Sequence, residues 1–351
     1  MSYIAIDGRR IGPGEPTFVI AELSANHGQD YELAVRLVRA AREAGADAIK
    51  LQTYTPDTLT IDCDAPDFRI GEGTLWSGRT LYELYGEAFT PWEWHAPLMA
   101  LSRELGMTCF STPFDATAVD FLERLEVPAY KIASFELVDL ALVRRVAETG
   151  KPIIMSTGMA TLAEIEEAVQ VARSAGCTEL ALLKCTSAYP SPPDAMHLRT
   201  IPHLADAFGV PVGLSDHTLG VAVPIAAAAL GACIVEKHFA LSRATPGPDS
   251  AFSLEPAEFA AMVEGVRTAQ AALGCVSYGV GRREEASRVF RRSLYVVSDV
   301  RAGDVFTPTS VRSIRPGKGM APRFLDDVLG RRAARDIRRG TPLDWSLVAG
   351  A

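Results

Sequence analysis

The chain has 351 residues, 48% of them hydrophobic and 22% charged, and a formal net charge of −8. This composition is that of an ordinary globular protein, and no apolar run is long enough to span a bilayer. The first ten residues lack the apolar core of a signal peptide, so we expect a cytoplasmic protein without a membrane partner. The length predicts one large and one small domain. The six cysteines form no C-x-x-C pair and are expected to be reduced, buried thiols.

Eight short apolar runs follow one another along the chain, and most of them end in a charged or hydroxyl residue. They occupy residues 18–23, 48–52, 108–112, 129–134, 152–157, 180–186, 212–217 and 233–239. Such continuous runs are typical of parallel strands that are buried on both faces. Helix-like segments that end at glycine alternate with them, as at 31–44, 161–175 and 256–273. The sequence therefore predicts an α/β fold, a closed (β/α)8 TIM barrel, whose active site lies at the carboxyl ends of the strands.

One connection in this pattern is unusually long. About 38 residues follow Gln52 before the next helix-like segment begins near Pro91, and loops of this length are commonly functional or disordered. The segment contains several aromatic residues, among them Trp76, which argues against disorder. We expect residues 53–90 to form an ordered flap over the mouth of the barrel.

The barrel pattern stops near residue 280. We expect a barrel domain at 1–280, a linker at 281–286 and a small β-rich domain at 287–351, in which DVRAGDVFT and DIRRGTPLD resemble an internal repeat. The last 65 residues carry 13 Lys and Arg against 6 Asp. This basic domain could bind nucleic acid, dock on the acidic barrel or bring cations to an anionic substrate. The absence of an aromatic-interleaved RNA motif or a helix-turn-helix pattern argues against nucleic acid.

Two histidines, His217 and His238, end the last two predicted strands. Imidazoles at neighbouring strand ends can share one divalent cation, and Glu236 lies two residues before His238, on the same strand face. Two nitrogen ligands leave positions for water or substrate, which suits an exchangeable Lewis acid better than a structural zinc. The alternative is a pair of structural histidines.

Lysines lie within otherwise apolar strands, at Lys50, Lys131, Lys184 and Lys237. Lysine is rarely buried unpaired, so these side chains must meet anions, either protein carboxylates such as Glu22 or a ligand. A phosphorylated, carboxylated substrate would satisfy them. The competing interpretation is a Schiff-base lysine, which requires a depressed pKa that the sequence does not reveal.

Three further features have both a functional and a structural interpretation. Hydroxyl groups end several strands, as at Ser134, Ser156 and Thr186, where they could hold phosphate or cap the following helix. Asp249, in a Gly/Pro-rich loop after the last strand, could reach the metal shell or stabilise a turn. Arg315, in the turn Arg-Pro-Gly-Lys-Gly, could reach a carboxylate or remain solvated.

Short sequence phrases along the chain, taken in their order, resemble those of the sialic acid synthase family, whose members condense phosphoenolpyruvate with an amino sugar. The matching phrases run from the first strand to the last domain, at 21–27, 50–54, 111–115, 130–134, 156–159, 184–190, 213–218, 236–239, 247–256 and 313–319. The C-terminal part resembles the SAF, or antifreeze-like, domain of that family. Residues 21–30, 74–94 and 248–256 are most similar to the branch that makes pseudaminic acid. Leu23-Ser24 stands where the N-acetylneuraminate branch has Ile-Gly.

The resemblance implies roles for individual residues. His217 and His238 correspond to the ligands of a divalent metal, usually Mn²⁺ or Mg²⁺, with Co²⁺ also possible. Glu22, Lys131 and Asp249 are implied as catalytic residues, with Glu22 handling protons or the attacking water. Substrate contacts are implied for Lys50, Gln52, Ser134, Ser156, Lys184, Thr186, Tyr189, Ser215 and Arg315. The family is a domain-swapped homodimer, in which Arg315 of one chain would reach the sugar in the barrel of its partner.

The resemblance also implies the reaction. Phosphoenolpyruvate would condense with 2,4-diacetamido-2,4,6-trideoxy-L-altrose to give pseudaminic acid and phosphate. N-acetylneuraminate and legionaminate synthases are alternatives with the same chemistry and another sugar. A Schiff-base aldolase and a non-catalytic sugar-binding barrel are alternatives of other classes.

Overall fold

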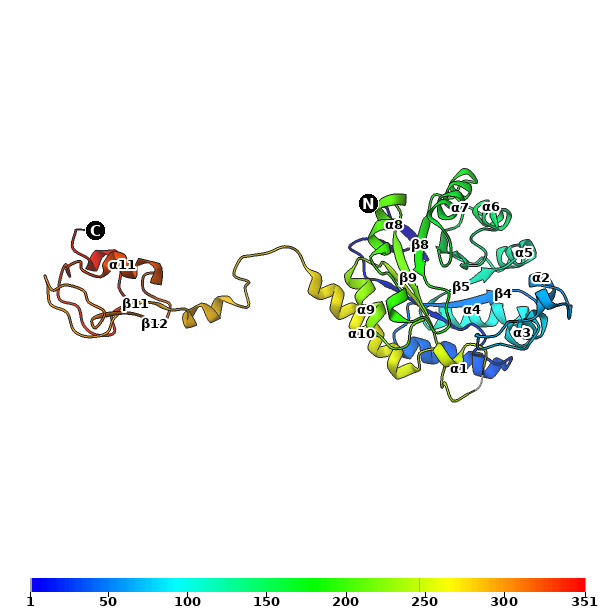
Figure 1. Cartoon of the computed structure of the whole chain (residues 1–351), viewed down its shortest axis with the longest axis horizontal. Coiled ribbons are helices and arrows are strands. Elements are labelled where there is room, and N and C mark those ends of the chain that lie inside the picture. The colour runs from blue at the N-terminus through cyan, green and yellow to red at the C-terminus, as the bar shows by residue number, and fades with distance from the viewer. Residues whose placement is uncertain (1, 246, 351) are drawn as a thin grey trace. The chain divides into compact units, whose positions relative to one another are not determined.

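The computed structural model describes residues 2–245 and 247–350 and divides the chain into two compact units, Met1–Gly274 and Cys275–Ala351 (Figure 1). Each unit has a hydrophobic core of its own. Within the described residues, no helix is both long and apolar enough to cross a membrane. The described cysteines are free; four are buried as expected, whereas Cys63 is half-buried and Cys275 is exposed.

The first unit is a closed parallel barrel, as predicted. Its strands lie side by side in chain order, and the barrel closes where the last strand pairs with the first. They are β3 (Phe18–Glu22), β4 (Ala48–Thr53), β5 (Thr108–Pro113), β6 (Tyr130–Ile132), β7 (Ile153–Ser156), β8 (Leu180–Cys185), β9 (Val212–Asp216) and β10 (Ile234–His238). Each predicted apolar run therefore coincides with one barrel strand to within a few residues.

Helices surround the strands and bury their apolar faces against them. They are α1 (Tyr31–Glu43), α4 (His95–Glu104), α5 (Ala116–Arg124), α6 (Leu140–Ala147), α7 (Leu162–Ser174), α8 (Thr200–Phe208), α9 (Ala222–Ala229) and α10 (Pro256–Leu273). Their starts follow capping chemistry: the Asp30 carboxylate accepts two backbone N–H groups of α1, and Thr161 and Glu164 form the predicted capping box of α7. Short 3₁₀ turns η2 (Trp92–Trp94), η3 (Pro193–Ala195) and η4 (Ser250–Phe252) complete the loops.

A hairpin that was not predicted precedes the barrel. It consists of β1 (Ile4–Ile6) and β2 (Arg9–Ile11), joined by Asp7 and Gly8, which both have positive φ. Its three isoleucines are fully buried against inward-facing residues near the amino ends of the barrel strands, such as Phe18 and Phe110. The hairpin thus closes this end of the barrel with apolar side chains.

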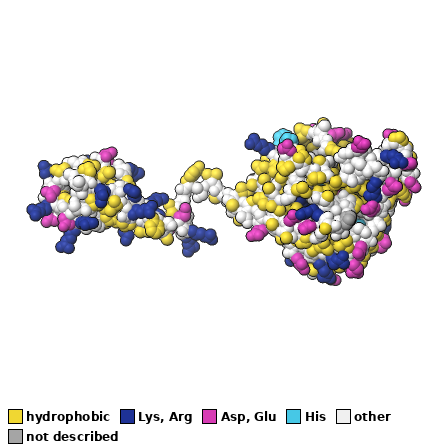
Figure 2. Space-filling view, turned by 60° about the horizontal axis from the view of Figure 1, so that its bottom comes forward, with side chains coloured by type: hydrophobic (Ala, Val, Ile, Leu, Met, Phe, Trp, Pro, Cys, Tyr) yellow, Lys and Arg dark blue, Asp and Glu magenta, His cyan; other side chains and the backbone are white. Residues whose placement is uncertain are grey.

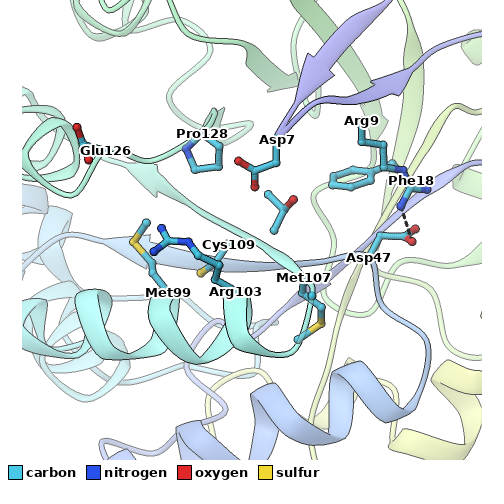
Figure 3. Close-up of a pocket in the computed structure, with 12 residues that line it drawn as sticks. Asp7, Arg9, Phe18, Asp47, Met99, Arg103, Met107, Cys109, Glu126 and Pro128 are labelled. Atoms are coloured by element: carbon cyan, nitrogen blue, oxygen red, sulfur yellow. Dashed lines mark ion pairs between the residues drawn. The ribbon is translucent and has the colours of Figure 1, made fainter.

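A cavity of about 430 Å³ lies beside the hairpin (Figure 3). Asp7 and Arg9 line it together with Met99 and Arg103 of α4, and Arg9 forms an ion pair of 2.6 Å with Asp47. The cavity lies at the amino ends of the strands, as its lining residues Phe18 and Thr108 show. It is therefore at the opposite end of the barrel from the polar strand ends described below.

The long connection after β4 is ordered and contains α2 (Pro56–Leu59), η1 (Pro66–Phe68) and α3 (Leu81–Ala88). The Trp76 indole N–H donates to the carbonyl oxygen of Pro248 at 2.9 Å, and its ring lies 5.8 Å from the ring of Tyr189. The segment therefore packs against the loops that follow β8 and β10.

The second unit is small and rich in short extended segments. It contains the antiparallel strands β11 (Ser293–Val296) and β12 (Val311–Ile314), helix α11 (Leu325–Val328), and the turns η5 (Glu285–Phe290), η6 (Pro322–Phe324) and η7 (Trp345–Leu347). Lys and Arg side chains are spread over the face of this unit seen in Figure 2.

The two phrases of the suspected repeat pair with each other. Val300 and Ile337 exchange backbone hydrogen bonds of 2.9 and 2.8 Å. The aspartate before each of them accepts a backbone N–H from the other phrase, Asp299 from Arg339 at 2.7 Å and Asp336 from Ala302 at 2.8 Å. The repeat is therefore a reciprocal pairing at the centre of this unit.

Candidate active site

The interior of the barrel is apolar near the hairpin. Two residues further toward the carboxyl end of the same strands, the inward side chains are polar. Because successive side chains point to opposite faces of a strand, residues two apart share the inward face. The inward pairs are Ile20 and Glu22, Ala48 and Lys50, Ala129 and Lys131, Ile154 and Ser156, and Ile234 and Glu236, with the apolar member always nearer the hairpin. A buried polar layer therefore forms at the carboxyl ends of the strands, where the sequence predicted the active site.

A network of two carboxylates and two lysines occupies this layer. Lys50 Nζ lies 2.7 Å from Glu22 Oε2 and 3.2 Å from Glu236 Oε1, and Lys131 Nζ lies 3.8 Å from Glu236 Oε1. Ser215 also donates to Glu236 Oε1 at 3.1 Å. All five side chains are buried, and the opposite charges compensate one another, which is what buried ions require.

Burial shifts the pKa values of two of these groups, Glu22 and Lys131, toward neutral pH. It raises the pKa of Glu22 to about 7, although Lys50 acts in the opposite direction. It lowers the pKa of Lys131 to about 8. Burial acts to raise the pKa of Glu236, but Lys131 and Lys50 outweigh it and hold that pKa below its usual value. Glu22 and Lys131 therefore have the pKa values expected of groups that exchange protons or bind ligands near pH 7.

Hydroxyl and backbone groups surround the end of β7. Lys131 Nζ donates to Ser156 Oγ at 2.7 Å, and the Gly158 N–H donates to Ser134 Oγ at 3.1 Å. A Cβ at position 158 would collide with the hydroxyls of Ser134 and Ser187, so only glycine lets these groups converge. Because Thr161 caps α7, Ser156 is free of that structural role. This cluster of donors can hold an anion.

At the end of β8, the family resemblance implied a substrate contact for Thr186 but not for Ser187. The structure instead places the Ser187 hydroxyl beside Gly158 and Ser134. Thr186 Oγ1 donates to the Ala195 carbonyl oxygen at 3.2 Å. The signal that could have found Ser187 is its place next to Thr186 in a run of hydroxyl residues after the strand.

The four strand lysines do not share one environment. Lys184 is half-buried and donates to the Cys185 carbonyl oxygen at 2.6 Å and to Thr186 Oγ1 at 3.1 Å, outside the network of Lys50 and Lys131. Lys237 is fully buried and pairs with Asp216 at 2.6 Å. Val235, two residues before Lys237, packs in the core between strands and helices, so Lys237 faces that layer. It needs no ligand.

The two histidines lie next to each other, with ring centroids 5.2 Å apart. His217 Nδ1 donates to the Thr186 carbonyl oxygen at 3.1 Å, so Nε2 is the ring nitrogen that remains to coordinate a cation. Burial and the neighbouring His217 hold the pKa of His238 well below its usual value, so His238 is neutral. Its Nδ1 is buried without a hydrogen-bond partner among the described residues.

This pair provides two of the ligands that a divalent cation needs. Among residues 2–245 and 247–350, no group of three or more His, Cys, Asp or Glu side chains is arranged to hold a metal ion. Two imidazoles, one of them oriented by a backbone carbonyl, fit a cation whose remaining positions are filled by water or substrate.

The other predicted residues lie around the network and the histidines. Gln52 Nε2 and the Ser24 N–H each donate to Glu22 Oε1 at 3.1 Å. Asp249 is half-buried and accepts a hydrogen bond from Ser24. The Tyr189 ring packs on His217 with centroids 4.4 Å apart. The structure thus brings Glu22, Gln52 and Asp249 together and places Tyr189 between His217 and the flap residue Trp76.

Arg315 belongs to the second unit, where it is exposed on a turn that its neighbours hold in place. The Gly317 N–H donates to the Val289 carbonyl oxygen at 2.9 Å, and the buried Ser293 hydroxyl donates to the Pro316 carbonyl oxygen at 2.6 Å. The guanidinium is thus presented by a fixed backbone.

Comparisons with known proteins agree with this arrangement. The NeuB family model matches residues 37–278, and the SAF domain model matches residues 291–349. A pseudaminic acid synthase from Campylobacter jejuni is 46% identical over 94% of this chain and 96% of that protein. An N,N'-diacetyllegionaminic acid synthase from Legionella pneumophila is 35% identical over 95% of each. The solved structure of the spore coat polysaccharide biosynthesis protein SpsE from Bacillus subtilis, 32% identical, covers 100% of both chains with a TM-score of 0.68.

Proposed function

Because the chain belongs to the NeuB family and ends in a SAF domain, we propose that it is a pseudaminic acid synthase. It condenses phosphoenolpyruvate with 2,4-diacetamido-2,4,6-trideoxy-L-altrose and releases phosphate. The observation that supports the choice of sugar is the 46% identity to a pseudaminic acid synthase over 94% of the chain, against 35% to a legionaminic acid synthase over 95% of it.

Phosphoenolpyruvate binds in the polar layer. Its phosphate and carboxylate need buried cations and hydrogen-bond donors, and Lys131, Ser156, Ser134 and the Gly158 N–H converge at the end of β7. Lys50 supplies a second cation, which pairs with the same oxygen of Glu236 as Lys131 does. Fixed charges of this kind stabilise the phosphate throughout the reaction and cost no reorganisation.

Glu22 acts on the proton of the attacking water. When C3 of phosphoenolpyruvate attacks the sugar aldehyde, positive charge develops at C2 and water adds there. The tetrahedral product then loses phosphate by C–O cleavage. A base with a pKa of about 7 is well suited to accept the proton of that water. The hydrogen bonds from Gln52 and from the Ser24 backbone hold one of its oxygens in place.

His217 and His238 would hold a divalent cation, which supplies Lewis-acid polarisation of the sugar aldehyde. Imidazole ligands with oxygen ligands from water and substrate suit Mn²⁺, and also Mg²⁺ or Co²⁺. We propose Mn²⁺ as the physiological metal. Asp249, which accepts from Ser24, and Tyr189, which packs on His217, contact the sugar.

The proposal includes a homodimer in which the SAF domain of one chain caps the barrel of the other. Two observations support it. Arg315 is exposed on a turn that is held by Ser293 and Val289, so it can be presented to another molecule. The last 65 residues carry 13 Lys and Arg against 6 Asp, whereas the chain as a whole is acidic.

One observation favours a second candidate, a Schiff-base aldolase. The pKa of Lys131 is lowered to about 8, as a nucleophilic lysine requires. Lys131 nevertheless donates to Ser156 and lies near Glu236, contacts that suit a charged anion-binding group. Borohydride reduction in the presence of pyruvate, followed by mass spectrometry, distinguishes the two: we expect no adduct, and a covalent adduct at Lys131 would support the aldolase.

The main test is an assay of phosphate release with phosphoenolpyruvate, Mn²⁺ and each candidate sugar. We expect the highest kcat/KM with 2,4-diacetamido-2,4,6-trideoxy-L-altrose and loss of activity with a chelator. Equal or better turnover of N-acetylmannosamine, or of the legionaminic precursor, would refute the assignment of the sugar. No condensation with any of them would refute the reaction.

A further inference from the structure

Ser24 has a backbone conformation that serine rarely adopts. Its φ is 45°, in the left-handed region that favours glycine, and its side chain is buried two residues after Glu22. Glycine would fit this position with less strain. The contacts of the Ser24 hydroxyl provide a reason for a side chain here.

That hydroxyl contacts two residues of the proposed sugar site, Gln52 and Asp249. Ser24 Oγ donates to Asp249 Oδ2 and accepts from Gln52 Nε2 at 3.1 Å. Gln52 Nε2 also donates to Glu22 Oε1 at 3.1 Å. Both amide hydrogens of Gln52 are therefore engaged, and its Oε1 is left as an acceptor. In the same way, Asp249 uses Oδ2 for Ser24 and keeps Oδ1 for another partner.

We propose that Ser24 is a positioning residue that fixes the orientation of Gln52 and Asp249 and thereby selects the amino sugar. This inference rests on the proposed function, because it assigns the two oriented acceptors to the sugar. The acceptors suit a sugar that offers N–H groups, as acetamido substituents do. Without the Ser24 hydroxyl, Gln52 keeps only its hydrogen bond to Glu22, and Asp249 Oδ2 loses its hydroxyl donor, so both acceptors are held less firmly toward the acetamido N–H groups. A sugar hydroxyl can both donate and accept, so a sugar with fewer acetamido groups depends less on this orientation.

The test compares two variants that remove the hydroxyl in different ways. Ser24→Gly removes the hydroxyl and relieves the backbone, whereas Ser24→Ala removes the hydroxyl and keeps the strain. Glu126→Gly is the matched control, because Glu126 also has positive φ, at 54°, but is exposed and lies outside the proposed site. KM and kcat are measured for each substrate, and melting temperatures report on folding.

We expect both Ser24 variants to raise KM for the diacetamido sugar by about tenfold or more, the usual effect of losing hydrogen bonds to a charged group. KM for phosphoenolpyruvate stays within about twofold, and the kcat/KM ratio of the diacetamido sugar to N-acetylmannosamine falls. Ser24→Gly melts at or above Ser24→Ala, and the kinetics of Glu126→Gly match those of the wild type.

The inference is overturned if both Ser24 variants keep the wild-type sugar KM and sugar preference. It is also overturned if KM for phosphoenolpyruvate rises in parallel, since that indicates a general distortion of the site. A wild-type enzyme that condenses none of the sugars refutes the proposed function instead, so the two failures are distinguishable.

Discussion

The two ends of the barrel interior differ in chemistry although the same strands build them. At the amino ends, Ile20, Ala48 and Ile154 pack with the isoleucines of the hairpin in a dry apolar layer. Two residues further along, the same strands contribute Glu22, Lys50 and Ser156 to a buried polar layer. The comparison shows that a shift of two residues along a strand separates side chains that stabilise the fold from side chains placed to bind substrate and take part in the reaction.

If this division is correct, a change in the polar layer should affect turnover without unfolding the protein. Glu22→Gln should reduce kcat by roughly a hundred- to ten-thousand-fold, the typical effect of removing a general base. The fold should persist, because a pKa of about 7 means that neutral Glu22 is already populated in the native protein.

Phosphate release gives kcat for this variant, and calorimetric titration shows whether it still binds phosphoenolpyruvate. Asp249→Asn is a useful comparison, since it also removes a carboxylate at the mouth, a half-buried one, but leaves Glu22 in place. Glu22→Gln with more than a tenth of wild-type kcat would exclude Glu22 as the base.

The outward-facing Lys237 should behave differently from the inward lysines. Lys237→Met leaves Asp216 buried without its cation, so we expect the free energy of unfolding to fall by about 3–5 kcal/mol. Urea denaturation measures this loss, with Lys318→Met, at an exposed position, as the control that should change little. A variant as stable as the control would show that the pair does not stabilise the barrel.

A change in the apolar layer should affect stability alone. Ile6→Ala removes a fully buried hairpin side chain and should lower the free energy of unfolding by about 2–5 kcal/mol. At temperatures well below the melting transition, KM and kcat should equal those of the wild type. A change in either constant would mean that the two ends of the barrel are coupled, which contradicts the division.

The barrel and the position of its site could be predicted because continuous apolar runs at helix-length spacing have few other interpretations. Which side chains point into the barrel and which point toward the helices could not be predicted. In strands buried on both faces, no alternation of polar and apolar residues marks the inward side, so Lys131 and Lys237 look alike in the sequence. The structure separates them: Lys131 joins Glu236 and Ser156, and Lys237 joins Asp216.

The hairpin and Ser24 were missed for different physical reasons. The hairpin strands have three residues each, too short for a periodic pattern, although the dipeptide Asp7-Gly8 is a known hairpin signal. The role of Ser24 depends on a backbone φ and on contacts with Gln52 and Asp249, residues far away in the sequence. Neither quantity can be read from the residue type.

The smallest expected effect is a pH dependence that arises in the polar layer. If Glu22 must be ionised to accept a proton, kcat/KM should fall about tenfold per unit as the pH drops below about 7, the raised pKa of that carboxyl. If Lys131 must be charged to bind phosphate, kcat/KM should also fall above about 8, its lowered pKa. The profile of kcat/KM for phosphoenolpyruvate should therefore be a narrow bell.

Ile6→Ala should keep this profile, since it leaves both groups unchanged, whereas Glu22→Gln should lose the acid limb. An acid limb near pH 4.5 would instead mean that Glu22 has an ordinary pKa and that burial does not raise it in the polar layer.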